Sequence, residues 1–153
     1  MHKLLVLLCS FDLCSCKEMR YLSIDYGNKI TGLAICDQTE TFVSPLMAIP
    51  TSDYLIDKII EVAKAENVGA LVLGLPLNMD DSVGPQAKKV QAFAEQIKKQ
   101  IDTPVFFQDE RLSTFAAEGK MIDMDLTRKG KKRRIDALAA AEILQAFLDS
   151  KKV

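Results

Sequence analysis

The segment 21–35, YLSIDYGNKITGLAI, constrains the fold of this chain more than any other segment. It contains two runs in which apolar residues recur at two-residue spacing, a pattern typical of half-buried strands. The recurring residues are Leu22, Ile24, Leu33 and Ile35. Gly27 and Asn28 separate the runs and can adopt the positive φ that a tight hairpin needs. We therefore expect an antiparallel strand pair at the start of the fold.

Asp25 is the unusual residue of this segment, because strand interiors are poor in aspartate. It ends the first run and stands beside Gly27, which leaves open space. One interpretation is a turn aspartate that accepts hydrogen bonds from nearby backbone N–H groups. The other is a carboxylate that holds a cation or a phosphate-bound metal above the sheet. Only the rest of the chain can decide between them.

The remaining chain alternates between strand and helix patterns. A third strand is predicted over 41–50, where Pro45 indicates an edge or irregular position. Thr51 or Ser52 is expected to cap an amphipathic helix that ends near residue 67, and the apolar run 70–76 suits a strand covered on both faces. Ser82 as a cap and Pro85 in the first turn predict a second helix to about residue 101.

The C-terminal part continues with a strand over 103–109, a shorter helix over 113–124, a basic loop over 128–134 and a last helix over 135–150. The order βββαβαβαα predicts an α/β fold with a mixed five-stranded sheet, three antiparallel strands then two parallel ones, and helices on both faces. Parallel central strands place their carboxyl ends at one edge of the sheet. Asp25 is thus expected to lie near Asp109 and Glu110.

Length and composition fit a single folded domain. The chain has 153 residues, 48% hydrophobic and 27% charged, which is enough for one substantial core. The formal net charge is −1, so a nucleic-acid partner must be held by a local basic cluster and not by overall charge. The four cysteines form no Cys-x-x-Cys pair, and Cys36 is expected to be a small buried hydrophobe in a reducing compartment.

Residues 1–18 resemble a signal peptide only superficially. Their apolar run is too short to span a bilayer, and no small-residue cleavage site follows it. Met19 stands directly before the first strand. We therefore expect residues 1–18 to be a disordered or non-native N-terminal extension, residues 19–153 to form the domain, and the protein to be cytoplasmic without a membrane partner.

Asp136 is a third carboxylate of interest, because it shares a helix face with apolar residues that should pack on the sheet. A charged residue there needs a cation or a hydrogen-bond partner, although a first-turn aspartate can also simply favour the helix dipole. Carboxylates converging from two strand ends and a helix start would repel each other unless divalent metal neutralised them. Oxygen ligands of this kind suit Mg²⁺ or Mn²⁺, and two such ions about 4 Å apart can promote phosphodiester hydrolysis.

The segment RKGKKRR, residues 128–134, has six basic residues in seven and directly precedes this carboxylate. Charge runs are commonly solvated loops, but here the cations adjoin the predicted metal site and can contact the phosphates of a polyanion. Arg111 can add a fork-shaped phosphate contact or pair with a structural carboxylate. The expected phosphate-binding residues are Lys29, Arg111, Arg128, Lys129, Lys131, Lys132, Arg133 and Arg134. His2 is the only histidine, so the sequence offers no nucleophile–histidine pair.

The motifs DYGNKITGLA, GLPLNMDDSVGPQA and DERLST, followed by the basic segment and Asp136, occur in this order. With them the chain resembles the YqgF/RuvX family of RNase H-like pre-16S rRNA nucleases over residues 19 to about 150. The resemblance implies an RNase H-like fold and a nuclease that cleaves ribosomal RNA precursors during 5′-end maturation. It also implies that Asp25, Glu110 and Asp136 are the catalytic metal ligands, with Asp109 as a fourth candidate.

Three functions stay open at this point. The first is a Mg²⁺- or Mn²⁺-dependent endonuclease acting on precursor rRNA, with the pre-ribosomal particle as a further partner. The second is a Holliday-junction resolvase, because fold alone does not choose between RNA and branched DNA. The third is a non-catalytic RNA- or ribosome-binding module in which the carboxylates are structural.

Overall fold

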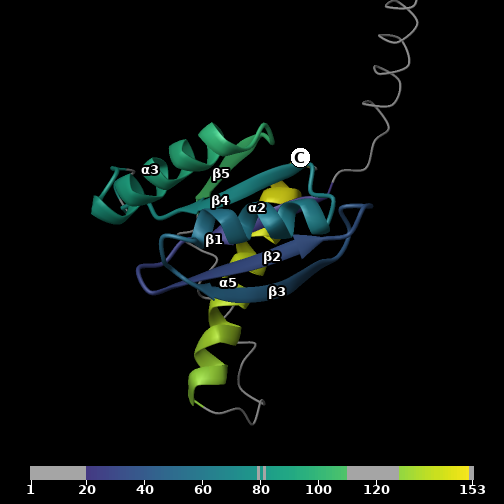
Figure 1. The fold of residues 1–153 in the computed structure, drawn as a ribbon, viewed down its shortest axis with the longest axis horizontal. Helices are drawn as coiled ribbons and strands as arrows, with labels where there is room; N and C mark the ends of the chain where they lie inside the picture. The colour runs from purple at the N-terminus through teal and green to yellow at the C-terminus, as the bar shows by residue number, and fades with distance from the viewer. Residues whose placement is uncertain (1–19, 79, 81, 110–127, 152–153) are drawn as a thin grey trace, which may run out of the picture.

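Five strands form one mixed sheet in the order β3-β2-β1-β4-β5 in a computed structural model of the chain (Figure 1). The structure describes residues 20–78, 80, 82–109 and 128–151, and for 128–133 the backbone only. β1 pairs antiparallel with β2, and β2 pairs antiparallel with β3, whereas β4 is parallel to both β1 and β5. The predicted sheet is confirmed. The strands are β1 (Tyr21–Asp25), β2 (Ile30–Cys36), β3 (Val43–Pro50), β4 (Ala70–Leu75) and β5 (Val105–Asp109).

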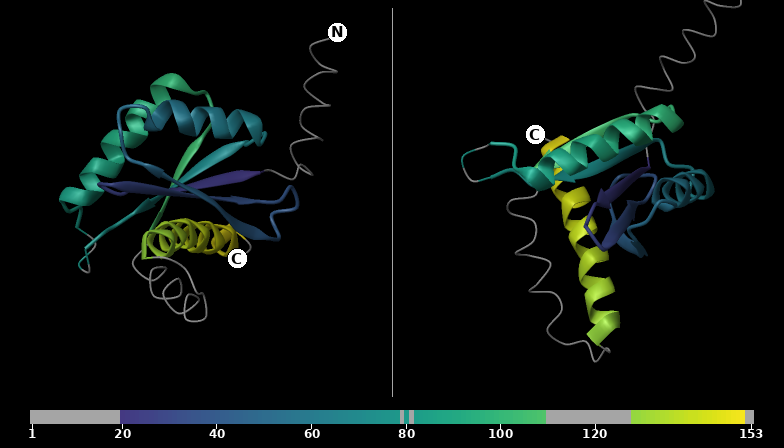
Figure 2. Two further views of the ribbon diagram at one scale, coloured as in Figure 1. Left: turned by 60° about the horizontal axis from the view of Figure 1, so that its bottom comes forward. Right: turned by 60° about the vertical axis from the view of Figure 1, so that its left-hand side comes forward.

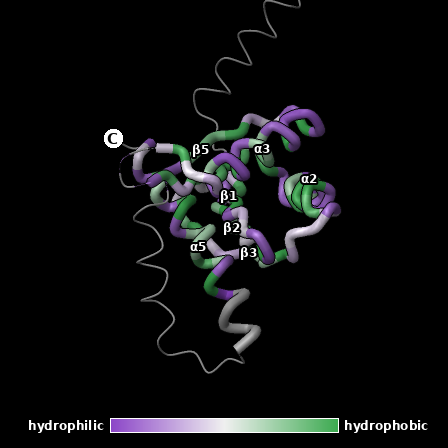
Figure 3. The backbone as a smooth tube through the Cα atoms, turned by 90° about the vertical axis from the view of Figure 1, so that its left-hand side faces the viewer, coloured by the Kyte–Doolittle hydropathy of each residue, from purple (hydrophilic) through white to green (hydrophobic). Residues whose placement is uncertain are grey.

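Helices cover both faces of the sheet, as predicted. α2 (Leu55–Ala65) and α3 (Pro85–Gln100) lie on one face, and α5 (Arg128–Lys151) crosses the other (Figure 2). Side chains alternate between the two faces along each strand. In β1, Leu22 and Ile24 belong to the core under α2 and α3, whereas Tyr21 packs with α5 residues. Figure 3 shows hydrophobic and hydrophilic residues alternating along α2 and α3, as expected for helices with one buried side.

β3 occupies the edge of the sheet that Pro45 predicted. Its pairing with β2 shifts between Leu33 and Ala34, whose partners are Met47 and Pro45. This bulge skips Leu46 and lies next to the proline, which cannot donate a ladder hydrogen bond. Cys36 at the end of β2 is buried, as predicted, and its Sγ accepts a hydrogen bond of 3.2 Å from the backbone N–H of Tyr21.

The predicted backbone of the β1–β2 turn was wrong. The glycines in the described part of the chain all have negative φ, and only Glu40 and Asn67 among its other residues have positive φ. A four-residue loop replaces the tight two-residue turn. Gly27 is needed there for space and not for φ, because a Cβ at this position would collide with the carbonyl oxygen of Ile30.

The predicted N-caps of α2 and α3 were also wrong. Tyr54 and Gly84 precede these helices, and neither caps with its side chain. The Thr51 hydroxyl instead donates to the carbonyl oxygen of Gly27 at 2.8 Å, so it serves the loop after β1. The Ser82 hydroxyl donates to Asp80 Oδ1 at 2.6 Å. Pro85 does stand in the first turn of α3, as predicted.

The basic segment 128–134 is helical and not the predicted loop. α5 begins at Arg128 and continues without a break to Lys151. Arginine and lysine are good helix formers, so no residue except Gly130 opposes an early start of this helix. The predicted extension 1–18 and the predicted short helix 113–124 lie outside the described residues. Within the described ranges, no helix is long and apolar enough to cross a membrane.

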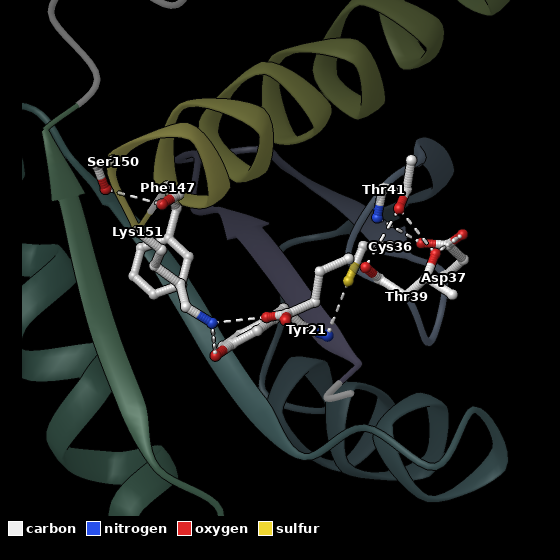
Figure 4. A network of polar contacts seen from close by, with 9 residues as sticks. Tyr21, Cys36, Asp37, Thr39, Thr41, Phe147, Ser150 and Lys151 are labelled. Atoms are coloured by element: carbon white, nitrogen blue, oxygen red, sulfur yellow. Dashed lines mark hydrogen bonds and ion pairs between the residues drawn. The ribbon is translucent and has the colours of Figure 1, made fainter. Parts of the chain in front are cut away.

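The C-terminal end of α5 is held against the sheet by polar contacts (Figure 4). Lys151 Nζ donates to Tyr21 Oη and to Glu40 Oε1, both at 2.6 Å. The same ammonium group lies 4.4 Å from the centroid of the Tyr21 ring. Desolvation by burial disfavours the charged ammonium, but the hydrogen bonds and charge interactions with Glu40 and Tyr21 together outweigh it and raise the pKa of Lys151.

Candidate metal and nucleic-acid site

Asp25 ends β1 on the face of the sheet that α5 covers. Its direct partner on β2 is Gly32, and cross-strand partners carry their side chains on the same face. The alternation along β1 agrees, because Tyr21 and Ser23 contact α5. Asp25 itself is half-buried. A carboxylate thus stands at the rim of the β1–α5 layer and remains reachable from solvent.

Asp136 reaches the same place from α5. A Cβ added at Gly32 would collide with the carbonyl oxygen of Asp136, so the helix backbone touches β2 there. The Asp136 side chain is half-buried, and its Oδ2 is shielded from solvent. Gly32 is therefore a neighbour of both carboxylate residues, across the ladder for Asp25 and by direct contact for Asp136. The structure brings these two predicted site residues together.

The loop after Asp25 is fixed from two sides. The Thr51 hydroxyl donates to the carbonyl oxygen of Gly27, and the Thr51 backbone N–H donates to that of Lys29 at 2.9 Å. From α3, Gln86 Nε2 donates to the carbonyl oxygen of Tyr26 at 3.4 Å. The Lys29 side chain is exposed. This predicted phosphate contact thus sits four residues after Asp25 on a braced loop.

Asp109 is placed differently from Asp25. It pairs with Leu75 of β4, whose side chain packs on the core beneath α2 and α3. The Phe107 ring, two residues earlier, lies under Lys98 of α3. Alternation along β5 therefore places Asp109 on the face of the sheet opposite α5.

Glu110 and Arg111 lie outside the described residues. Glu110 as the third metal ligand therefore remains a prediction. Within the described part of the chain, no three His, Cys, Asp or Glu side chains gather in a way that could hold a metal. The two carboxylates that do meet are hard oxygen donors, which Mg²⁺ and Mn²⁺ prefer. The residues present therefore fit a divalent cation as two of its ligands.

The basic segment forms the first two turns of α5 and leads directly to Asp136. Arg134 is exposed, and positions 132 and 133 precede Asp136 by one helical turn. The first turn contains no acidic residue. Positive charge at a helix N-terminus opposes the helix dipole. The helix dipole therefore gives no reason for cations at this end of α5.

Three residues important to this geometry were not assigned to the site from the sequence. Gly32 and Ser23 act through long-range contacts with α5, and Thr51 was predicted as a helix cap. One signal was available for Ser23: it is a polar residue at the same strand parity as Asp25, inside an otherwise apolar run.

The family model that matches this chain and the similar curated proteins point to the same family. The family model RuvX, described as Holliday junction resolvase, matches residues 19–150. A protein from Roseiflexus sp. (strain RS-1) is 43% identical over 136 residues, which cover 87% of this chain and 96% of that protein. One from Bacillus cereus (strain G9842) is 41% identical over 137 residues, covering 87% and 100%. Both are named "Putative pre-16S rRNA nuclease".

Solved structures share the fold at low sequence identity. Thermus thermophilus RuvC in complex with a Holliday junction substrate matches with a TM-score of 0.55 and 15% identity, over 88% of this chain and 96% of that one. Fowlpox virus resolvase in complex with Holliday junction DNA matches with a TM-score of 0.55 and 14% identity, over 87% and 99%. These likenesses confirm the predicted fold class.

Proposed function

We propose, since this chain belongs to the RuvX family of nucleases, that it is a metal-dependent endonuclease that hydrolyses phosphodiester bonds of precursor 16S rRNA. Its task would be the maturation of the 5′ end of that rRNA in the cytoplasm, on free precursor or on a pre-ribosomal particle. The curated relatives named above support the substrate. The family supports the reaction class.

The observation that carries the proposal is the meeting of Asp25 and Asp136 at Gly32. Asp25 and Asp136 come from distant parts of the sequence to the same face of the sheet, and carboxylates that converge on one site favour a bound cation. Asp25, Asp136 and Glu110 are the residues that would hold Mg²⁺ or Mn²⁺. When bound, such a cation supplies activated water and stabilises the leaving oxygen.

The chain's own residues supply position and charge. The β1–β2 ladder and α5 position Asp25 and Asp136, and the loop braced by Thr51 carries Lys29 four residues after Asp25. The cations at the start of α5, Arg128, Lys129, Lys131, Lys132, Arg133 and Arg134, would contact backbone phosphates, with Arg111 as a further contact. The helix dipole disfavours cations in the first turn of α5, so a polyanionic partner explains their placement better than the dipole does.

Replacing Asp25 by asparagine tests the proposal. Asp25→Asn keeps the size and polarity of the side chain but removes the charge that holds a cation. We expect cleavage of a 5′-extended pre-16S rRNA fragment with Mg²⁺ to fall at least about 100-fold, a magnitude typical of losing a direct metal ligand or its support. The thermal midpoint should change little.

Asp102→Asn is the matched control, because Asp102 is exposed and lies in the connection between α3 and β5, far from Asp25 in the sequence. It should cleave at the wild-type rate. Cleavage by Asp25→Asn at the wild-type rate with metal present would show that the assignment of the site is wrong.

Branched DNA is the second candidate substrate, and the description of the matching family model favours it. Wild-type protein should be assayed on the rRNA fragment and on a four-way DNA junction at equal concentrations. Faster cleavage of the rRNA supports the first proposal. Cleavage of the junction alone would replace it with the resolvase function.

A further inference from the structure

We infer that Ser23 is a positioning residue whose hydroxyl sets the register of α5 over β1, and thereby the spacing of Asp25 and Asp136. This inference rests on the proposed function for its catalytic consequence. Its structural part stands on the contacts of Ser23 alone, so the two can be tested separately.

Ser23 is fully buried, with 0% of its surface exposed. Its hydroxyl donates to the carbonyl oxygen of Ala140 at 2.6 Å, with a second, longer contact of 3.5 Å to that of Ala34. Ser23 stands two residues before Asp25 on the same face of β1, and Ala140 stands one helical turn after Asp136. One short bond therefore joins the two segments that carry the carboxylates.

This bond is not needed to satisfy the helix. Ala140 lies within α5, where its carbonyl oxygen can accept the N–H of the residue four positions later. A serine in an apolar strand also costs desolvation, which an alanine would avoid. The hydroxyl thus adds a directional contact at a position where the core itself requires none.

Small residues line the layer between the sheet and α5 near Asp136, whereas the larger side chains Ile143, Leu144 and Leu148 pack on the sheet further along the helix. Ala34, Ala140 and Ala141 form the local cluster, and Gly32 lies next to it. Such small residues let the helix approach closely, but they present no ridges that interlock and define a register. A slide of α5 by a single residue amounts to about 1.5 Å. A displacement of about 1 Å at a catalytic group can already cost about 100-fold in rate.

A second polar tie between β1 and α5 lies at the far end of the helix, where Lys151 Nζ donates to Tyr21 Oη. Tyr21→Phe is therefore a matched control: it removes a hydroxyl from the same face of the same strand, away from the carboxylates. Ser23→Ala is the test variant. Ser23→Cys, similar in size with a weaker donor, should fall between Ser23→Ala and wild type.

Two measurements decide the matter. Amide hydrogen exchange reports the packing of α5 near Asp136 and Ala140, and we expect it to speed up about tenfold in Ser23→Ala but not in Tyr21→Phe. Mn²⁺ titration and cleavage kinetics report the site. There, Ser23→Ala should weaken Mn²⁺ binding and lower kcat about 10-fold, as losses of supporting partners do, while KM for RNA stays within about twofold.

Unchanged exchange in folded Ser23→Ala would overturn the inference, as would wild-type Mn²⁺ affinity and kcat in that variant. Equal effects in Tyr21→Phe would show that Ser23 contributes only to general stability, and would also overturn the inference. If the wild-type protein binds no Mn²⁺, the proposed function fails, and the exchange comparison still decides whether Ser23 sets the register.

Discussion

At the scale of single residues, the candidate site depends on Gly32, because a residue with a Cβ would not fit at this position. Gly32 has the negative φ common to the glycines of the described chain, so its value lies in space. A Cβ there would meet the main chain of Asp136, which cannot swing aside as a flexible side chain could. The close approach of β2 and α5, and with it the meeting of Asp25 and Asp136, requires glycine at this position.

Gly32→Ala should therefore push α5 away from the sheet. We expect the free energy of unfolding to fall by about 1–3 kcal/mol, the usual cost of overpacking a core, together with a loss of metal-dependent cleavage. Urea denaturation measures the first effect. Gly84→Ala is the control: the nearest atoms to its added Cβ belong to the Asn78 side chain, at 3.2 Å and beyond, and that side chain can move. Equal stability of Gly32→Ala and wild type would contradict the close contact.

At the scale of elements, the β2–β3 turn shows how a single carboxylate organises a loop (Figure 4). Asp37 Oδ2 accepts from the Thr39 hydroxyl at 2.6 Å, and Oδ1 accepts from the backbone N–H groups of Thr41 and Phe42 at 2.8 and 3.1 Å. These donors, the Thr39 hydroxyl foremost, lower the pKa of Asp37 below 3.8. The turn is thus tied by the ionised carboxylate.

The pH dependence follows from the sign of this shift. A carboxyl whose pKa is lowered on folding contributes stability above its unfolded value, here 3.8, and loses it as the pH falls through the folded value. We expect the NMR titration midpoint of Asp37 to lie below 3.8 in wild type, and to move up toward that value in Thr39→Val. A wild-type midpoint above 3.8 would contradict the hydrogen-bonded turn.

The elements themselves were largely predictable from the sequence, because their signals are local. The alternation in 21–35 and the apolar run 70–76 define β1, β2 and β4, and Pro45 marks the edge strand. The start of α5 was mispredicted because a dense charge run resembles a solvated loop, although its residues favour helix. Local signals sufficed wherever burial and periodicity agreed.

The assembly of the site was only partly predictable. Asp25 and Asp136 stood out because aspartate is costly in a strand and on an apolar helix face. Ser23 and Thr51 did not, since their roles depend on partners far away in the sequence, Ala140 and Gly27. A hydroxyl's bonding partner cannot be inferred from periodicity. Such contacts require the three-dimensional register of helix and sheet.

At the scale of the whole molecule, the distribution of charge matters more for binding a polyanion than the net charge does. The net charge is −1, yet six basic residues open α5 next to Asp136. A polyanion held by such a cluster releases counterions, so its affinity falls as salt rises. The cluster, and not the overall charge, should set the strength of RNA binding.

Arg134→Gln tests this claim, because Arg134 is exposed at the start of α5. We expect the slope of log K against log salt for RNA binding to become shallower by about 0.7–0.9 if one phosphate contact is lost. Fluorescence anisotropy across a salt series measures the slope. Lys64→Gln, which removes an exposed charge from α2 on the other face, should leave the slope unchanged. Equal slopes for Arg134→Gln and wild type would remove Arg134 from the interface.

The most direct test is calorimetric titration of the protein with Mn²⁺, because it measures metal binding at the site without an RNA substrate. Wild type and Asp102→Asn should give a saturable heat of binding. Asp25→Asn and Asp136→Asn should each weaken binding at least about tenfold, since each removes one of the charged oxygen donors that meet at Gly32. No heat with wild type, or equal heats for all four proteins, would contradict a metal site at these carboxylates and leave a non-catalytic binding module.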